Sequence, residues 1–493
     1  LLQERVPRTG AAPEAAAGEV LPSRPSESEG AEPAMRVFTS PVTVVPEVHL
    51  LSNGRYHVMV SAAGGGYSRW NDVAITRWRA DPTSESLGVF CLISDATDRR
   101  EWSSAFQPLL RREPSYEAIF TSGRAELRTQ EDGVETHTEI AVSPEDDLEI
   151  RRITLTNRSD SPRSLVVTSY AEVVLAPAVT DEVHRAFSNL FVRAELEPSH
   201  CAILATRRPR SIDESPPWMF ALLLSTEPTV GVASFETDRA RFIGRGRTMR
   251  QPVAMDDTRP LSGTAGAVLD PCAAIRRTVE LGVDSRVHLD LIIGAAPSRE
   301  AAMALIAKYQ DHRMADRVFE MAVTHSRAVL GHVGASEADG LRYGQLASAA
   351  IYPLAAFRAS STIVRRNRRG QAGLWGAAIS GDLPIVLVRV SDAENLQIVR
   401  DLLRAHAYWR MQGLLTDLVI WNADASGYRQ VLAEQILGLV SGGTEAQLLD
   451  RPGGVFVRHV DSFPEEERVL LQAAARIVVR DSDGPLPEQL DRW

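Results

Sequence analysis

The chain has 493 residues, of which 44% are hydrophobic and 24% are charged, a composition typical of a globular protein with about two to four domains. Its formal net charge of −10 argues against general nucleic-acid binding, which needs a basic surface. No apolar run of about 18 residues predicts a membrane span. The three cysteines, Cys91, Cys201 and Cys272, lack metal-ligand spacing and favour a reducing compartment over a disulfide framework.

Residues 1–36 are rich in Ala, Pro, Glu and Ser. Such a composition buries too little apolar surface to form a core, so it predicts a disordered linker that tethers the rest of the chain to an upstream domain. The start of the chain also lacks an initiator Met and a signal peptide. We therefore expect this chain to be part of a longer protein.

Residues 37–296 show mainly period-two alternation, which is typical of strands. Many strands with few helices over this length predict a large antiparallel β-sandwich. Within it, Leu148 and Ile150 alternate with charged residues, whereas Ile153 and Leu155 continue one residue out of step. This slip predicts a β-bulge.

The stretch from Ser52 to Asp81 places three consecutive glycines, Gly64 to Gly66, between two strand patterns. Glycines allow positive φ and a close backbone approach. Aromatic and guanidinium side chains lie beside such a loop, in Tyr67 and in the two groupings Arg69-Trp70 and Arg77-Trp78-Arg79. They suit the apolar faces and hydroxyls of a sugar. A tight hairpin with Trp70 and Trp78 in the core is the alternative.

The periodicity becomes helical near Ser298, a candidate N-cap, and residues 297–338 are predicted to form a helical linker. Further helices are predicted over 341–356, kinked at Pro353, over 392–411 and over 428–439. Paired helices separated by loops favour a toroid of helical hairpins over 339–493. A stacked solenoid is the alternative, although no fixed repeat length supports it.

A second stretch with candidate functional side chains runs from Arg365 to Pro384. Arg366, Arg368 and Arg369 could hold phosphate or form a solvated charge run. Asp382 could present its carboxylate to sugar hydroxyls or cap the next helix, and Trp375 lies between these two groups. A third patch consists of Trp409, Asp417 and Trp421. Its tryptophans either stack on a sugar ring or are buried in the core. The sequence contains no nucleophile motif or metal-ligand cluster.

Five ordered segments carry a family resemblance: GGGYSRW, TRWRAD, FETDRARFIGRGRT, TAGAVLDP and GLWGAAISGDLPIVLVRV. Together they resemble the C-terminal phosphorylase-like region of bacterial cyclic β-1,2-glucan synthases, over its N-terminal part. That region belongs to glycoside hydrolase family 94, formerly glycosyltransferase family 36. The resemblance covers the chain from about Val37 to its end.

The resemblance implies a fold and an activity. The fold is a sandwich of the galactose-mutarotase type, a helical linker and a six-hairpin α/α toroid. The activity is inverting phosphorolysis of β-glucosidic bonds, with inorganic phosphate as co-substrate and no metal or other cofactor. Asp382 would bind sugar, Arg366, Arg368 and Arg369 would lie on the phosphate side, and Tyr67, Arg69 and Trp70 would approach the mouth of the active site.

The chain departs from the family in its general acid, which in the family is an Asp of a DWND-type segment. The order Trp-Asn-Asp occurs here only at Trp70 to Asp72, in the sandwich. We therefore expect the acid to lie beyond Trp493, the toroid to be incomplete and the chain to be inactive alone.

The expected partners are a β-glucan oligosaccharide, the remainder of the parent synthase and, in addition, a second copy in a homodimer. The parent would be an inner-membrane protein with this region in the cytoplasm. A non-catalytic carbohydrate-binding or structural module, and a phosphorylase of another β-glucoside such as cellobiose, are the alternatives.

Overall fold

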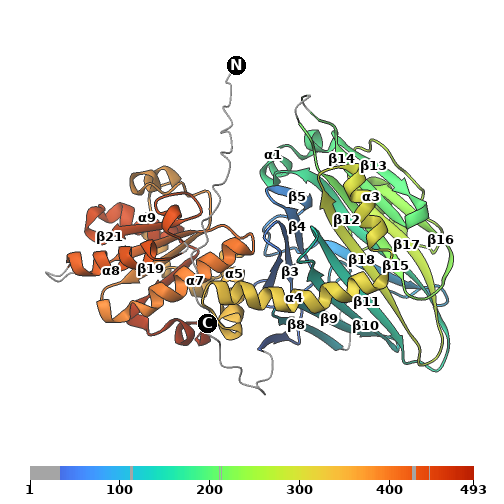
Figure 1. Ribbon diagram of the computed structural model, residues 1–493, viewed down its shortest axis with the longest axis horizontal. Helices are drawn as coiled ribbons and strands as arrows, with labels where there is room; N and C mark the ends of the chain where they lie inside the picture. The colour runs from blue at the N-terminus through green and yellow to red at the C-terminus, as the bar shows by residue number, and fades with distance from the viewer. Residues whose placement is uncertain are drawn as a thin grey trace, which may run out of the picture. The chain divides into compact units, whose positions relative to one another are not determined.

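The computed structural model describes residues 34–111, 115–209, 211, 214–424, 429–443 and 445–492 (Figure 1). The predicted disordered linker therefore lies outside the described residues up to residue 33. Its last two residues, Met35 and Arg36, belong to the first strand, β1 (Met35–Phe38). The three cysteines are all unpaired.

Two nine-stranded sheets form an antiparallel sandwich. The first has the order β1 (Met35–Phe38), β8 (Ser115–Thr121), β9 (Arg124–Glu131), β10 (Val134–Val142), β11 (Leu148–Asn157), β18 (Arg286–Ala296), β15 (Trp218–Ser225), β14 (Ala202–Arg207), β13 (Val192–Glu197). The second has the order β16 (Thr229–Asp238), β17 (Pro271–Leu281), β12 (Arg163–Ala176), β5 (Val73–Thr76), β4 (Gly66–Trp70), β3 (Tyr56–Ser61), β2 (Val48–Ser52), with β6 (Val89–Asp95) on β12 and β7 (Glu101–Ser103) on β6.

Alternating side chains from the inner faces of both sheets fill one core. In β9, for example, Ala125, Leu127 and Thr129 are buried while the residues between them are more exposed. Two short helices, α1 (Ala178–Asn189) and α2 (Arg239–Ile243), interrupt the strand order. The predicted β-sandwich is confirmed.

The predicted bulge in β11 is wrong, because this strand pairs with β10 and β18 without a register shift. The change of phase has another cause. Leu148 and Ile150 pack under the helices that follow the sandwich, whereas Ile153 and Leu155 point into the sandwich core. The beginning of the strand therefore has both faces covered.

Helices α3 (Arg299–Lys308) and α4 (His312–His332) follow the last strand and lie against the first sheet (Figure 1). Ser298 caps α3 by accepting a hydrogen bond from the Ala301 backbone amide, as its position suggested. Helix α5 (Glu337–Ile351) begins with a Ser336–Asp339 capping box. It ends before Pro353 instead of kinking there, because a residue that precedes proline disfavours helical φ/ψ.

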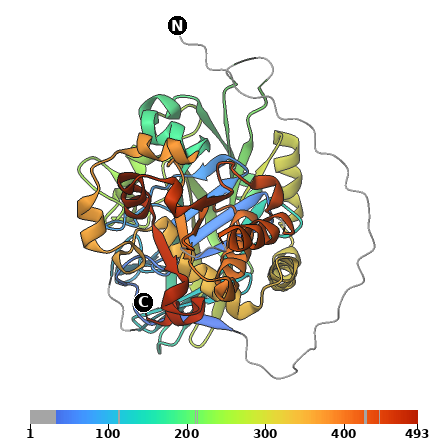
Figure 2. The same ribbon diagram turned by 90° about the vertical axis from the view of Figure 1, so that its left-hand side faces the viewer.

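The structure contradicts the predicted toroid in the C-terminal part. After the short helix α6 (Ser361–Arg366), four parallel strands form a sheet in the order β21-β20-β19-β22. This part of the chain, in orange and red, faces the viewer in Figure 2. The strands and helices alternate along the chain: β19 (Ile385–Val390), α7 (Gln397–Met411), β20 (Asp417–Asn422), α8 (Arg429–Ser441), β21 (Val455–His459), α9 (Glu465–Ala474), β22 (Ile477–Arg480), α10 (Leu486–Asp491).

The parallel sheet forms because its strands are short, continuous apolar runs that bury both faces. The face that carries Val386, Val388 and Ile420 packs on α5, α7 and α8. The face that carries Leu387 and Val419 packs on α9 and on the segment after α6. Trp409 and Trp421, the aromatic residues of the third sequence patch, are buried in these two cores.

The sandwich and the parallel sheet share one of these cores. Val48, Leu50 and Met59, on β2 and β3, pack in the same cluster as α5 and α7. Hydrogen bonds cross the same boundary, since the Val48 amide donates to Ser348 Oγ at 2.9 Å. The sheet is therefore fixed against β2 to β4 of the sandwich by its amino-terminal edge.

Candidate functional site

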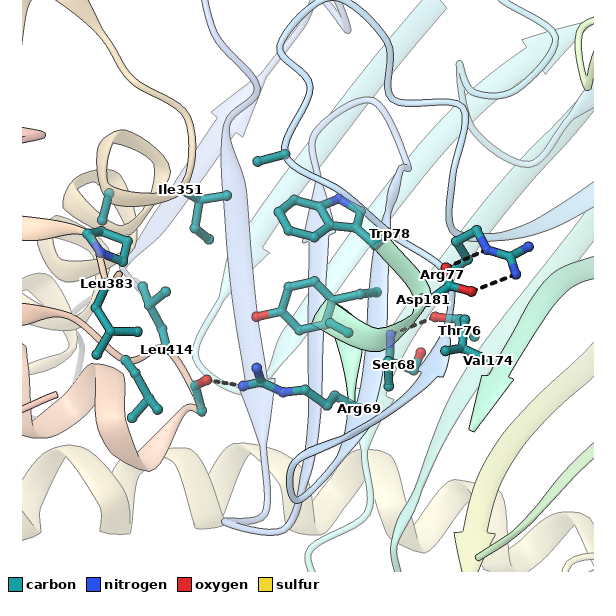
Figure 3. Close-up of a pocket in the computed structure, with 18 of the residues that line it drawn as sticks. Ser68, Arg69, Thr76, Arg77, Trp78, Val174, Asp181, Ile351, Leu383 and Leu414 are labelled. Carbon is teal, nitrogen blue, oxygen red and sulfur yellow. Dashed lines mark hydrogen bonds and ion pairs between the residues drawn. The ribbon is translucent and has the colours of Figure 1, made fainter. Parts of the chain in front are cut away.

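A cavity of about 290 Å³ lies between β4 and β5 of the sandwich and the amino-terminal edge of the parallel sheet (Figure 3). Its sandwich side is lined by Tyr67, Ser68, Arg69, Ala74, Thr76, Arg77, Trp78, Ala80, Val174, Ala178 and Asp181. Its other side is lined by Ala350, Ile351, Leu383, Pro384, Gly413, Leu414, Leu415 and Arg476. Mainly apolar walls with a few polar groups are typical of small-molecule sites.

The three glycines form the tight connection that leads into β4. Gly64 and Gly66 have φ values of +95° and +153°, and a Cβ atom on Gly66 would lie 1.9 Å from the Met59 carbonyl oxygen. Only glycine fits this close approach of two backbones. The glycine run thereby sets the start and the phase of β4.

That phase directs alternate side chains to opposite faces. Tyr67 and Arg69 line the cavity. Trp70 lies on the other face, where its Nε1 donates to Asp147 Oδ2 at 2.8 Å. Of the three predicted residues of this loop, the structure brings Tyr67 and Arg69 to the cavity and leaves Trp70 outside it.

Trp78 supplies the aromatic wall of the cavity, and its indole lies opposite Ile351, Leu383 and Leu414 (Figure 3). It makes edge contacts with Tyr67 and Tyr352, with ring centroids 5.2 and 6.1 Å apart. Burial raises the pKa of Tyr67, which keeps its hydroxyl protonated as a donor.

Arg69 joins the two sides of the cavity. Its Nη2 donates to the carbonyl oxygen of Gly413, the residue that ends the turn after α7 (Figure 3). Its Cζ lies 5.5 Å from the centroid of the Tyr67 ring, close enough for a cation–π contact. Nε of Arg69 has no hydrogen-bond partner among the described residues.

A buried ion-pair cluster closes the far wall. Arg77 donates to Asp181 Oδ2 at 2.8 Å and to Glu172 Oε2 at 2.6 Å. Burial acts to raise the pKa of Glu172, but the guanidinium groups of Arg77 and Arg239 outweigh it, and the pKa lies below its usual value. The charged side chains of this wall therefore neutralise one another.

Asp382 lies on the loop before β19, directly beside the cavity residues Leu383 and Pro384. Its carboxylate is exposed and accepts a hydrogen bond from Gln371 Nε2 at 2.8 Å. The alternative that Asp382 caps the next helix is wrong, since the next element is a strand.

The remaining predicted residues lie apart from the cavity. Trp375 is 65% exposed in the 3-10 helix Gln371–Ala377. Arg366 and Arg369 form ion pairs with Glu465 and Glu466 of α9. These four charges balance one another on the surface. Arg368 donates to the backbone oxygen of Arg365 at 3.1 Å.

Two wall residues, Gly413 and Leu414, were not predicted from the sequence, whereas Trp78 belongs to one of the two Arg-Trp groupings that the sequence analysis singled out. The only sequence signal for Gly413 is a glycine directly after a helical pattern, which marks a helix end. For Trp78, the signal is its place between Arg77 and Arg79 at a strand end. Neither signal indicates a cavity, because the opposing wall comes from a distant part of the chain.

A group of metal-ligating side chains, Glu126, His137 and Glu139, lies on β9 and β10, where one ligand atom from each lies within 4.8 Å of the others. Arg128 and Arg124 already pair with Glu126 and Glu139, at 3.0 and 2.7 Å. The two carboxylates are therefore neutralised by arginines.

The family model described as "Glycosyl hydrolase 94, supersandwich domain" matches residues 31–312. The chain is 33% identical over its full length to the cyclic beta-(1,2)-glucan synthase NdvB of Rhizobium meliloti (strain 1021) and spans 17% of that protein. It is 22% identical to the N,N'-diacetylchitobiose phosphorylase of Vibrio furnissii, over 57% of this chain and 35% of that protein.

Among solved structures, a galactose mutarotase related enzyme from Lactobacillus acidophilus aligns with a TM-score of 0.30 and 10% identity, over 50% of this chain and 97% of that one. That likeness carries no weight beside the family match, which covers more than half of the chain. The chain belongs to the glycosyl hydrolase 94 family, of which it contains the supersandwich domain.

Proposed function

We propose that this chain is a glucan-holding part of a cyclic β-1,2-glucan synthase. The parent would act on β-1,2-glucans by inverting phosphorolysis or chain-length control, with inorganic phosphate as its co-substrate. The identity of 33% to NdvB over the whole of this chain supports the assignment of the parent protein as such a synthase. The observation that carries the binding role is the cavity in which Trp78, Tyr67 and Arg69 converge, and Asp382 directly precedes its lining residues Leu383 and Pro384.

The chemistry of this cavity suits a glucose unit. The Trp78 and Tyr67 rings offer apolar surface to the C–H faces of the sugar. The unpartnered Nε of Arg69 and the exposed Asp382 carboxylate supply a donor and an acceptor for hydroxyl groups. Arg77 and Asp181 are committed to each other and hold the wall in place.

This chain is proposed to bind without cleaving. Inverting phosphorolysis needs a carboxylic acid that protonates the leaving oxygen. Asp181 accepts two hydrogen bonds from Arg77, so its oxygens already face a guanidinium group. Asp382 is exposed and bonded to an amide. Neither carboxyl group is both shielded from water and free to face a leaving oxygen, as a general acid must be.

Calorimetry and a phosphorolysis assay on one protein sample test the proposal. We expect sophorose and longer β-1,2-glucans to bind, Asp382→Ala to weaken that binding several-fold, and no glucose 1-phosphate to appear with inorganic phosphate. Robust turnover by residues 1–493 would overturn the non-catalytic role. Absence of any binding would leave a purely structural module, and tighter binding of cellobiose than of sophorose would favour another β-glucoside.

The proposed place of this region is the cytoplasmic side of an inner-membrane parent. Among the described residues, no helix is long and apolar enough to cross a bilayer. Protease accessibility of the parent in spheroplasts and in inverted vesicles would test the side: digestion of this region in intact spheroplasts would contradict it.

A further inference from the structure

A second, larger cavity of about 530 Å³ lies on the sandwich. Its polar lining includes Glu85, Gln107, Glu172, Arg239, Arg247 and Arg250. These side chains come from separate parts of the chain that the sandwich brings together. The walls differ from those of the first cavity, which are mainly apolar and aromatic.

Two arginines of this cavity, Arg239 and Arg247, belong to the segment Phe235–Thr248, one of the motifs that the first cavity does not use, and Arg250 follows that segment. Asp238 caps α2 by accepting from the Ala240 amide at 2.9 Å. Phe242, Ile243 and Met249 are buried in a small core beneath the loop. These apolar anchors fix the backbone, and Arg247, between Ile243 and Met249, and Arg250, directly after Met249, line the cavity.

The charges in the cavity alternate in sign. Glu172 is 3% exposed, and its two oxygens accept from Arg77 at 2.6 Å and Arg239 at 2.5 Å. Oε1 of Glu85 is buried without a hydrogen-bond partner among the described residues. Arg250 forms no ion pair within the described part of the chain and is exposed. The cavity thus offers an exposed donor and a carboxylate oxygen without a protein partner in the part of the chain that the structure describes.

One segment of the chain, from Arg77 to Leu87, contributes lining residues to both cavities. Arg77, Trp78 and Ala80 line the first cavity, and residues 82–87 line the second. Glu172 bridges Arg77, which lines the first cavity, and Arg239, which lines the second. The two cavities are therefore lined by neighbouring parts of one segment of the chain.

We propose that the second cavity is a further saccharide subsite that takes a neutral, polyhydroxylated unit of the glucan through Glu85 and Arg250. Hydroxyl groups both donate and accept, so they match the exposed guanidinium of Arg250 and the Oε1 of Glu85, which is unpaired among the described residues. The ligand class rests on the proposed function. The subsite would extend the binding surface beyond the disaccharide held in the first cavity.

The test compares sophorose with long β-1,2-glucans by calorimetry on the full chain. We expect Arg250→Ala and Glu85→Gln each to weaken binding of the long glucan about tenfold, as expected for a lost hydrogen bond to a charged group. Sophorose binding should be unchanged in both variants. Arg245→Ala, which removes an exposed arginine outside the cavity lining, is the matched control and should bind like the unchanged chain.

Hydrogen exchange followed by mass spectrometry gives an independent readout, with glucan-dependent protection expected at residues 82–87 and 247–250. If long glucan binds but Arg250→Ala and Glu85→Gln change neither its affinity nor the protection, the second subsite is overturned and the proposed function stands. If neither ligand binds to the unchanged chain, both proposals fail.

Discussion

Trp78 is the residue on which the first cavity depends most. It contacts Tyr67 on β4 and Tyr352 after α5, so its indole connects the sandwich to the opposite wall. The period-two alternation in the sequence places Tyr67 and Arg69 on one face and Trp70 on the other. The alternation does not predict which of these faces lines a cavity, because the opposite wall of the cavity is formed by residues 383–384 and 413–415, far away in the sequence.

We expect Trp78→Ala to weaken sophorose binding roughly tenfold, because an aromatic contact contributes about 0.5–1.5 kcal/mol beyond the area that it buries. Isothermal titration calorimetry measures the change. Trp375→Ala is the matched control, since that indole is 65% exposed and outside the cavity. Equal losses in the two variants would contradict the assignment.

At the scale of elements, the turn between α7 and β20 holds the parallel sheet against β3. Gly413 has φ of +79°, and a Cβ atom there would lie 2.4 Å from the His57 ring. The same residue accepts the hydrogen bond from Arg69. The absence of a side chain at Gly413 therefore sets how closely the two elements approach.

Gly413→Ala should lower the free energy of unfolding by about 1–3 kcal/mol, since it combines a left-handed φ with a steric overlap. Gly438→Ala is the control: a Cβ atom at this position in α8 would meet no atom within 4 Å, and the change should raise stability by about 0.5–1 kcal/mol. Urea unfolding followed by circular dichroism compares the two. A midpoint of Gly413→Ala equal to that of the unchanged chain would disprove the close-approach argument.

For the whole molecule, the shared core makes the contact between the sandwich and the parallel sheet sensitive to acid. Burial, and then the charge of Arg69, lower the pKa of His57 from 6.5 to about 4. The unfolded chain binds this proton at a higher pH than the folded one does, so the stabilisation is complete above pH 6.5 and is lost as the pH falls toward 4.

Protonation of His57 in the unfolded chain should therefore lower the free energy of unfolding by about 2 kcal/mol when the pH falls from 7 to 5, since each unit of pKa difference corresponds to about 1.36 kcal/mol. His57→Asn, which keeps a donor toward Ser52 Oγ, removes this titration. We expect urea unfolding at the two pH values to show a smaller stability loss in the variant than in the unchanged chain. Parallel losses in both proteins would assign the acid sensitivity to other groups, such as His49.

The sequence by itself determined the elements whose signal is local. Strand alternation predicted the sandwich, the Ser298 cap marked the start of α3, and the glycine run predicted a backbone turn at Gly64 to Gly66. These features depend on φ/ψ preferences and on the period of a single segment, which neighbouring residues in the sequence encode.

Only the tertiary structure decided the rest. The apolar runs of β19 to β22 are compatible with buried helices or strands, and their pairing as a parallel sheet depends on partners far away in the sequence. The ion pairs of Arg366 and Arg369 with α9 likewise follow from that packing. Both cavities arise where distant segments meet, so no local pattern could have placed Trp78 opposite Leu414 or brought Glu85 and Arg250 to the same cavity.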